Sequence, residues 1–407
     1  PQPLSPVPLT TYAGLESQPS FSPDGTQVAF VWRRGRDVDI YIKQIGVEEP
    51  FRLTNHPADE LSPAWSPDGG YIAFTRALPN EKFAVVVVPQ RGGPERVVVE
   101  FAWPPPLLRR APTPVASLAW TPDSKSLVAA GRDNSKEPFG LFMVSVASGE
   151  KRRLTSPPEA DSGDSAPAVS PDGRTIAFSR FSGEPSHLYL LQLSADGRAD
   201  GEPARLPSAG LVNAGPAWTA DGREIVFWAA PQQFNAGALW RMTPSKSAVP
   251  HQLALTGQLA VGPAISPRGG RLAYTAVSVD TNIWRVNISG SDRESRQPAK
   301  FIASTKKEMA PDYSPDGKRI AFMSERSGAP EIWVCDSEGS HPVQLTSFGR
   351  PLTNGPRWSP DGEQIVFYSD AAGNRDVYVV NARGGAPRRL TDHPSTDTNP
   401  EWSRDGR

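Results

Sequence analysis

Ser22-Pro23-Asp24-Gly25 is a sequence motif that recurs along the whole chain, and its repetition decides the fold. Full copies begin at Ser66, Ser170, Ser314 and Ser359, and degenerate copies begin at Thr121, Thr219, Ser266 and Ser403. The intervals between successive copies run from 44 to 55 residues. Self-similarity at such a period indicates an array of supersecondary units.

Each copy of the motif, which we call an anchor, contains the residues typical of a tight turn. Proline presets φ, aspartate bonds the backbone ahead of it, and glycine supplies the positive φ that closes the turn. Strand patterns surround the anchor: residues 27–32 are rich in β-branched and aromatic types, and residues 39–45 alternate with period two. We therefore expect the anchor to join the first two strands of each repeat, rather than to bind a metal ion.

Four short strands per repeat at this period are typical of a propeller blade. The sequence thus predicts an all-β fold, a β-propeller of about eight four-stranded antiparallel blades that spans residues 1–407 as a single domain. An incomplete ninth unit is the alternative to a ring of eight, and we expect the chain to be a piece of a longer protein. The predicted anchors begin at residues 22, 66, 121, 170, 219, 266, 314, 359 and 403.

Composition excludes several classes of function. The formal net charge of -1 is not the basic footprint of a nucleic-acid-binding segment. No apolar run approaches the roughly 20 residues of a membrane span. The single cysteine, Cys335, has no partner for an internal disulfide. A local basic cluster at residues 151–153 and a turn-rich tip at residues 196–201 are expected on the surface.

Catalytic patterns are missing from the sequence. No serine has the Gly-x-Ser-x-Gly setting of a nucleophile elbow, and no glycine-rich phosphate loop is found. No histidine has a second histidine or a cysteine at metal-ligand spacing. We therefore predict no enzyme activity in this segment, no cofactor and no metal site.

One end of the predicted propeller invites a binding site, because the loops that enter the first strands ring one mouth of the central channel. These loops are rich in acidic and amide side chains, which either cap turns locally or bind a peptide, a cation or a small polar ligand. The candidate ligand-binding residues are Asp59, Glu60, Asp161, Asp164, Asn213, Asn354, Asp397 and Asn399.

Five tryptophans stand in matching places just before an anchor. Their regular position predicts that they pack between neighbouring blades rather than stack on a ligand. They are Trp65, Trp120, Trp218, Trp358 and Trp402.

The anchor, the Ile-Ala-Phe that follows it and the Leu-Thr at the end of the repeat together resemble the TolB family of bacterial propeller repeats. Residues 18–66 and 308–406 carry the resemblance best, and the repeat region of soil-bacterial regulators with a winged-helix or protein-kinase domain is similar as well. The resemblance implies an extracytoplasmic sensor or scaffold that binds a protein or peptide partner. The alternative is the propeller gating domain of a prolyl-oligopeptidase-type serine peptidase without its hydrolase domain.

Overall fold

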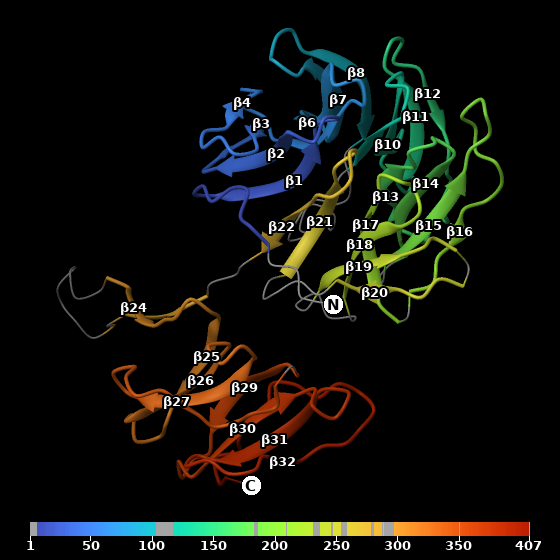
Figure 1. Cartoon of the computed structure of the whole chain (residues 1–407). Helices are drawn as coiled ribbons and strands as arrows, with labels where there is room; N and C mark the ends of the chain where they lie inside the picture. The colour runs from blue at the N-terminus through green and yellow to red at the C-terminus, as the bar shows by residue number, and fades with distance from the viewer. Residues whose placement is uncertain are drawn as a thin grey trace. The chain divides into compact units, whose positions relative to one another are not determined.

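The fold is described by a computed structural model (Figure 1) in which every regular element of the described residues is a β-strand. The described residues are 6–102, 117–182, 186–208, 210–230, 237–245, 247–253, 259–277, 281–286, 288, 297–349 and 351–406. The chain forms two compact units: unit 1 spans Pro1–Val277 and unit 2 spans Ser278–Arg407.

Unit 1 begins with three four-stranded antiparallel sheets, each built from consecutive strands. The first holds β1 (Leu15–Phe21), β2 (Gln27–Arg34), β3 (Asp37–Gln44) and β4 (Phe51–Arg52). The second holds β5 (Glu60–Trp65), β6 (Tyr71–Leu78), β7 (Lys82–Pro89) and β8 (Arg96–Ala102). The third holds β9 (Leu118–Trp120), β10 (Ser126–Gly131), β11 (Gly140–Ser145) and β12 (Lys151–Arg153).

Two further four-stranded sheets and a two-stranded sheet complete unit 1. The fourth holds β13 (Gly163–Val169), β14 (Thr175–Phe181), β15 (Ser186–Gln192) and β16 (Ala204–Arg205). The fifth holds β17 (Val212–Trp218), β18 (Ile225–Ala230), β19 (Ala238–Met242) and β20 (His251–Gln252). The two-stranded sheet pairs β21 (Leu259–Ile265) with β22 (Leu272–Val277).

Unit 2 continues the same pattern. A short pair, β23 (Ile283–Arg285) and β24 (Ala299–Ile302), is followed by two four-stranded sheets. The first of these holds β25 (Glu308–Tyr313), β26 (Arg319–Ser324), β27 (Glu331–Asp336) and β28 (Val343–Gln344). The second holds β29 (Thr353–Trp358), β30 (Gln364–Ser369), β31 (Asp376–Asn381) and β32 (Arg388–Arg389).

These sheets confirm the all-β propeller architecture and are consistent with about eight blades, since β21 to β24 are the strands of the sixth sequence repeat. That all eight repeats form one propeller over residues 1–407 stays a prediction.

The first strands of the six sheets in unit 1 contact one another in a closed cycle. β1 contacts β5, β5 contacts β9, and the series continues through β13 and β17 to β21. β21 in turn contacts β1, and Figure 1 shows these two strands beside each other. Unit 1 is therefore a ring of six sheets.

The anchors of neighbouring sheets also contact one another around this ring. Gly69 lies against Pro23 of the preceding anchor, and Gly222 lies against Pro171 in the same way. At the closing point, Gly25 has φ 67° and a Cβ there would lie 2.6 Å from Ser266 Oγ, so glycine permits the contact. The Arg271 guanidinium donates to the Gly25 carbonyl at 2.7 Å, which joins the last sheet of the ring to the first.

Hydrogen bonds inside the anchors confirm that they are turns. The Ser22 hydroxyl donates to Asp24 Oδ1 at 2.5 Å and accepts from the Gln27 amide at 2.9 Å. Asp24 Oδ1 also accepts from the Thr26 amide at 3.0 Å. Because Ser66, Thr121, Ser170, Thr219, Ser314 and Ser359 repeat the hydroxyl-to-aspartate bond, it is a standard part of the repeat.

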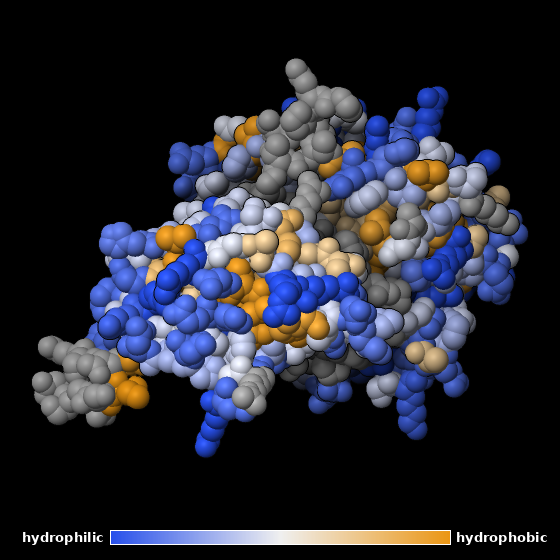
Figure 2. All heavy atoms as spheres, turned by 90° about the horizontal axis from the view of Figure 1, so that it is seen from below, coloured by the Kyte–Doolittle hydropathy of each residue, from blue (hydrophilic) through white to orange (hydrophobic). Residues whose placement is uncertain are grey.

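In most sheets the core lies around the second strand, where a large apolar side chain follows a small or branched one. Phe74, Phe178 and Phe227 are fully buried in unit 1, and Phe322 and Phe367 are their counterparts in unit 2. Charged and polar side chains cover most of the face shown in Figure 2, with a few apolar patches between them. The inner strands are buried on both faces, as the unbroken buried runs of β3 and β7 show, so the half-buried strand predicted at residues 39–45 is corrected.

Four of the five tryptophans bond to the neighbouring sheet, as the sequence predicted. Trp120 Nε1 donates to the Ala64 carbonyl at 2.8 Å, and Trp218 Nε1 donates to that of Ala168 at 3.0 Å. In unit 2, Trp358 and Trp402 make the same bond to Asp312 and Arg357. Trp65 differs, because its indole faces the Gly69 carbonyl of its own anchor at 3.4 Å.

The lowered pKa of an anchor aspartate predicts how the stability of the fold depends on pH. The Ser22 hydroxyl, followed by the Thr26 amide, lowers the pKa of Asp24 from 3.8 to about 2. A carboxyl with a lowered folded-state pKa stabilises the fold above its unfolded pKa, and this stabilisation is lost as pH falls through the folded value. In urea unfolding at pH 6 and pH 3, we expect Asp24→Asn to cost more stability at pH 6 than at pH 3. An equal cost at both pH values would contradict this role.

Candidate interaction site

The predicted mouth residues divide between the two units. Asp59, Glu60, Asp161, Asp164 and Asn213 lie in unit 1, and Asn354, Asp397 and Asn399 lie in unit 2. Glu60, Asp164 and Asn213 share one repeat position, two residues before a residue with left-handed backbone in the first strand. Those left-handed residues are Ser62, Ala166 and Gly215, and each precedes a proline.

The shared position serves an ion pair across the first two strands. Asp164 is fully buried and lies opposite Arg180, which donates from Nε and Nη2 at 2.6 and 2.9 Å. Glu60 is fully buried opposite Arg76, whose Nε donates to it at 2.7 Å. These two acids therefore hold their own sheets together.

Burial controls the protonation of these acids. It raises the pKa of Asp164, and the hydrogen bonds from Arg180 and Thr155 oppose that rise. Burial likewise raises the pKa of Glu60, against hydrogen bonds from Thr54 and Arg76. Thr54 and Thr155 belong to the Leu-Thr that ends the preceding repeat, so each acid also links two neighbouring sheets.

Asn213 departs from this arrangement. It lies opposite Ala229 rather than an arginine, and Pro207 stands where Thr54 and Thr155 stand in the other repeats. Asn213 is fully buried, and among the described residues its carboxamide has no hydrogen-bond partner.

The other predicted residues are more exposed and have local contacts. Asp59 lies 3.6 Å from Arg33, and the Asp161 amide donates to the Pro158 carbonyl. Asn354 Oδ1 accepts from the Gly355 amide at 2.7 Å. The Asp397 amide donates to the Arg375 carbonyl, and Asn399 is exposed with φ 53°. Ligand binding by the eight residues stays a prediction.

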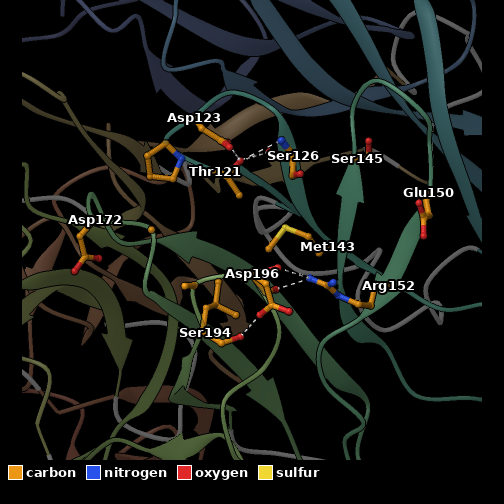
Figure 3. Close-up of a pocket in the computed structure, with 15 residues that line it drawn as sticks. Thr121, Asp123, Ser126, Met143, Ser145, Glu150, Arg152, Asp172, Ser194 and Asp196 are labelled. Atoms are coloured by element: carbon orange, nitrogen blue, oxygen red, sulfur yellow. Dashed lines mark hydrogen bonds between the residues drawn. The ribbon is translucent and has the colours of Figure 1, made fainter.

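A polar groove lies between the third and fourth sheets of unit 1, on the side of their anchors (Figure 3). Its volume is about 560 Å³. The third sheet contributes its anchor, β11 and β12, and the fourth contributes its anchor and the turn after β15. The residues that line the groove include Asp123, Glu150, Arg152, Asp172, Asp196 and Gly197.

Carboxylates dominate the groove. The hydroxyls of Thr121, Ser170 and Ser194 are the largest cause of the lowered pKa values of Asp123, Asp172 and Asp196, respectively. All three are therefore ionised at neutral pH, and Glu150 adds a fourth, exposed carboxylate. The resulting charge favours a cationic group.

The arginine in the groove is already engaged. Arg152 Nη2 donates to the Gly197 carbonyl at 2.7 Å and lies 3.4 Å from that of Asp196 (Figure 3). It thus joins the two sheets. The aspartates of the groove accept hydrogen bonds from the hydroxyls of their own turns, and Asp196 also pairs with the exposed Arg198 at 2.7 Å, so a cationic ligand there would compete with Arg198. The basic cluster 151–153 and the tip 196–201 are separate features of the sequence, and they meet because of how the two sheets pack.

Other classes of site are not seen in the residues that the structure describes. Among them, no group of three or more His, Cys, Asp or Glu side chains is placed to hold a metal ion. In the same part of the chain, no helix is long and apolar enough to cross a membrane. Burial, the main cause, raises the pKa of the Cys335 thiol to about 11, which keeps it protonated at neutral pH.

The fold defines a β-propeller, and sequence comparisons narrow that class. A family model described as the TolB beta propeller domain matches residues 271–407. Two Tol-Pal system proteins TolB, from Francisella tularensis subsp. mediasiatica (strain FSC147) and subsp. tularensis (strain SCHU S4 / Schu 4), are each 26% identical over 180 residues. The matched part is 44% of this chain and 39% and 38% of those relatives, so the chain spans well under half their length.

A solved structure agrees on the fold. The putative TolB from Agrobacterium tumefaciens is similar with a TM-score of 0.51 and 20% identity, over 67% of this chain and 93% of that one. Together, these findings show that the chain is similar to TolB propellers.

Proposed function

We propose that this chain is a non-catalytic interaction module that binds a basic, extended segment of a partner protein. The observation that carries the proposal is the groove of ionised carboxylates between two sheets that Arg152 links. The TolB-like repeats support a role in protein interaction, since the relatives are named as parts of the Tol-Pal system. The peptide experiment described below also tests whether a neutral polar ligand binds the same groove.

The wider setting follows from the repeat family. We infer that the module serves as a sensor or scaffold region of a larger bacterial regulator and acts outside the cytoplasm. The likeness to Tol-Pal system proteins supports the extracytoplasmic part of this setting. Among the predicted mouth residues of unit 1, Asn213 remains a second candidate, because it is buried and its carboxamide has no hydrogen-bond partner among the described residues.

The positions of the carboxylates in the groove determine which side chains a partner segment must carry. Lysine and arginine side chains extend far enough to place a cation beside Glu150 and Asp196, which line the groove from its two sheets. Ion pairs at such exposed positions are worth about 0.2–1 kcal/mol each, so affinity requires several of them along one segment. Binding should therefore weaken as ionic strength rises.

Labelled (Lys-Ser)5, (Gln-Ser)5 and (Glu-Ser)5 peptides test the proposal on the full chain. We expect (Lys-Ser)5 to bind most tightly by fluorescence anisotropy. The double variant Glu150→Gln/Asp196→Asn should weaken it about two- to thirtyfold, because two ion pairs of about 0.2–1 kcal/mol are lost.

Glu202→Gln is the matched control, because this exposed glutamate lies in the fourth repeat but not in the groove. It should leave both affinity and melting temperature unchanged. Equal binding of the three peptides, or equal loss in the control, would remove the groove as the interaction site. Tight binding of (Gln-Ser)5 with no salt dependence would instead favour a neutral polar ligand.

A further inference from the structure

The first sheet of unit 1 departs from the repeat pattern at two side chains, Trp32 and Lys43. β2 and β3 pair in register, and both side chains lie on the same face of that pair. Trp32 stands at the position that Arg76 and Arg180 occupy in the second and fourth sheets. A tryptophan cannot make the ion pair that these arginines make, so its role at this position is different.

Lys43 is the second departure. Its side chain is buried, whereas the same position is apolar and at most 2% exposed in each of the other six four-stranded sheets. The residues at that position are Val88, Val144, Leu191, Met242, Cys335 and Val380. Burial of an ammonium group is costly unless oxygen atoms surround it. A lysine at this core position therefore requires acceptors of its own.

Three oxygen atoms surround the Lys43 ammonium group. Two are the carbonyl oxygens of Val47 and Glu48 in the turn after β3, each 2.7 Å from Nζ. The third is the phenol oxygen of Tyr12, at 2.9 Å. Since an ammonium group has three donors, Tyr12 supplies the acceptor that completes the set.

These contacts select a phenol. The Tyr12 hydroxyl accepts from Lys43 and donates to the Glu48 carbonyl, and a single oxygen atom that does both is a hydroxyl. The Tyr12 ring centre lies 4.8 Å from that of Trp32 and 5.4 Å from Lys43 Nζ. A phenylalanine would keep the ring contacts and lose both hydrogen bonds, whereas a serine or threonine would lose the ring contacts.

The segment that carries Tyr12 is weakly fastened. Among the described residues, no backbone-to-backbone hydrogen bond joins residues 6–13 to the first sheet, and the pairing of β1 begins at Leu15. Trp32 Nε1 donates to the Ala13 carbonyl at 3.1 Å, and Ala13 itself is exposed. A segment without a backbone ladder opens at low cost in free energy. Tyr12 can therefore exchange with a similar side chain from elsewhere.

We propose that Trp32, Lys43 and the turn at residues 47–48 form a docking site for an extended, tyrosine-bearing segment of a partner protein. We call it the phenol site. Tyr12 occupies it as the chain's own competitor, and it shows which chemistry fits: a phenol between small residues. The inference is independent of the proposed function, because it concerns a different surface and an uncharged side chain.

A labelled peptide that copies residues 8–15 tests the phenol site on full-length wild type, Tyr12→Phe and Tyr12→Ala. In fluorescence anisotropy, we expect Tyr12→Ala to bind it at least about tenfold more tightly than wild type, because an intramolecular competitor acts at a high effective concentration. Tyr12→Phe should lie between the two. A peptide with phenylalanine in place of tyrosine should bind Tyr12→Ala at least about tenfold more weakly, since a hydrogen bond from a charged group is lost.

Lys43→Met is the matched control, because methionine stands at this position in the fifth sheet as Met242. Combined with Tyr12→Ala, it should bring the affinities of the tyrosine and phenylalanine peptides much closer together. A lysine with only a structural role would leave the difference between the two peptides unchanged. Glu150→Gln/Asp196→Asn in the Tyr12→Ala background should bind the tyrosine peptide as before, which separates this site from the groove.

Two results would overturn the proposal. One is a folded Tyr12→Ala chain that binds the tyrosine peptide no more tightly than wild type does. The other is equal binding of the tyrosine and phenylalanine peptides. If Tyr12→Ala does not fold, Tyr12→Phe decides the question, because it must then bind the tyrosine peptide more tightly than wild type.

Discussion

Replacing Arg180 with alanine is expected to lower the free energy of unfolding by about 3–5 kcal/mol, as when one partner of a buried ion pair is removed. Asp164 is fully buried and loses both bonds from the guanidinium in this variant. An unpaired carboxylate in that position has no access to water in compensation. Urea unfolding of wild type and variant at pH 7 measures the difference.

The fifth sheet supplies the control for this experiment. There the chain itself has Asn213 opposite Ala229, at the positions of Asp164 and Arg180. The double variant Asp164→Asn/Arg180→Ala copies that pair into the fourth sheet and removes the buried charge. We expect it to recover most of the lost stability. A double variant as unstable as Arg180→Ala would show that the arginine acts through packing, since its guanidinium also lies 4.8 Å from the Tyr189 ring centre.

The pH dependence of Arg180→Ala has a definite sign. Burial already raises the pKa of Asp164, and loss of the arginine removes an opposing interaction. A carboxyl with a raised folded-state pKa contributes stability below its unfolded pKa, and that contribution is lost as pH rises through the folded value. The variant should therefore be closer to wild type at pH 4 than at pH 8.

Truncation of Trp120 to alanine is expected to cost about 3–5 kcal/mol, the range for large aromatic side chains removed from a core. The indole is 8% exposed, and its Nε1 bonds to the Ala64 carbonyl of the preceding sheet. The variant loses apolar contact between two sheets and leaves a buried carbonyl without its donor. Chemical unfolding measures the cost.

Two comparisons separate these contributions. Trp120→Phe keeps most of the apolar contact and should cost only part of the alanine value, chiefly the bond worth about 0.5–1.5 kcal/mol. Trp284→Ala removes a side chain that is 58% exposed and should have a small effect. If Trp120→Ala were no worse than Trp284→Ala, the indole would not be a packing residue.

The residue types of the candidate sites could be predicted from the sequence, but their burial and their partners could not. Acidic and amide residues before each first strand were visible in the sequence, but Glu60, Asp164 and Asn213 proved to share one repeat position and to be buried. Their arginine partners lie on the next strand, and a pairing register was needed to place them opposite. The groove joins Arg152 to the turn at Gly197, 45 residues away in the chain, so no local pattern marks it.

The sequence by itself determined the repeats, the turns at the anchors and the four-stranded antiparallel units, because turn residues and strand-forming residues act over a few positions. Only the tertiary structure decided that β21 meets β1 and that six sheets close into a ring within unit 1. The anchors resemble one another, so no single anchor specifies which other it will contact. That choice depends on how neighbouring sheets pack around the axis, where Arg271 reaches the carbonyl of Gly25.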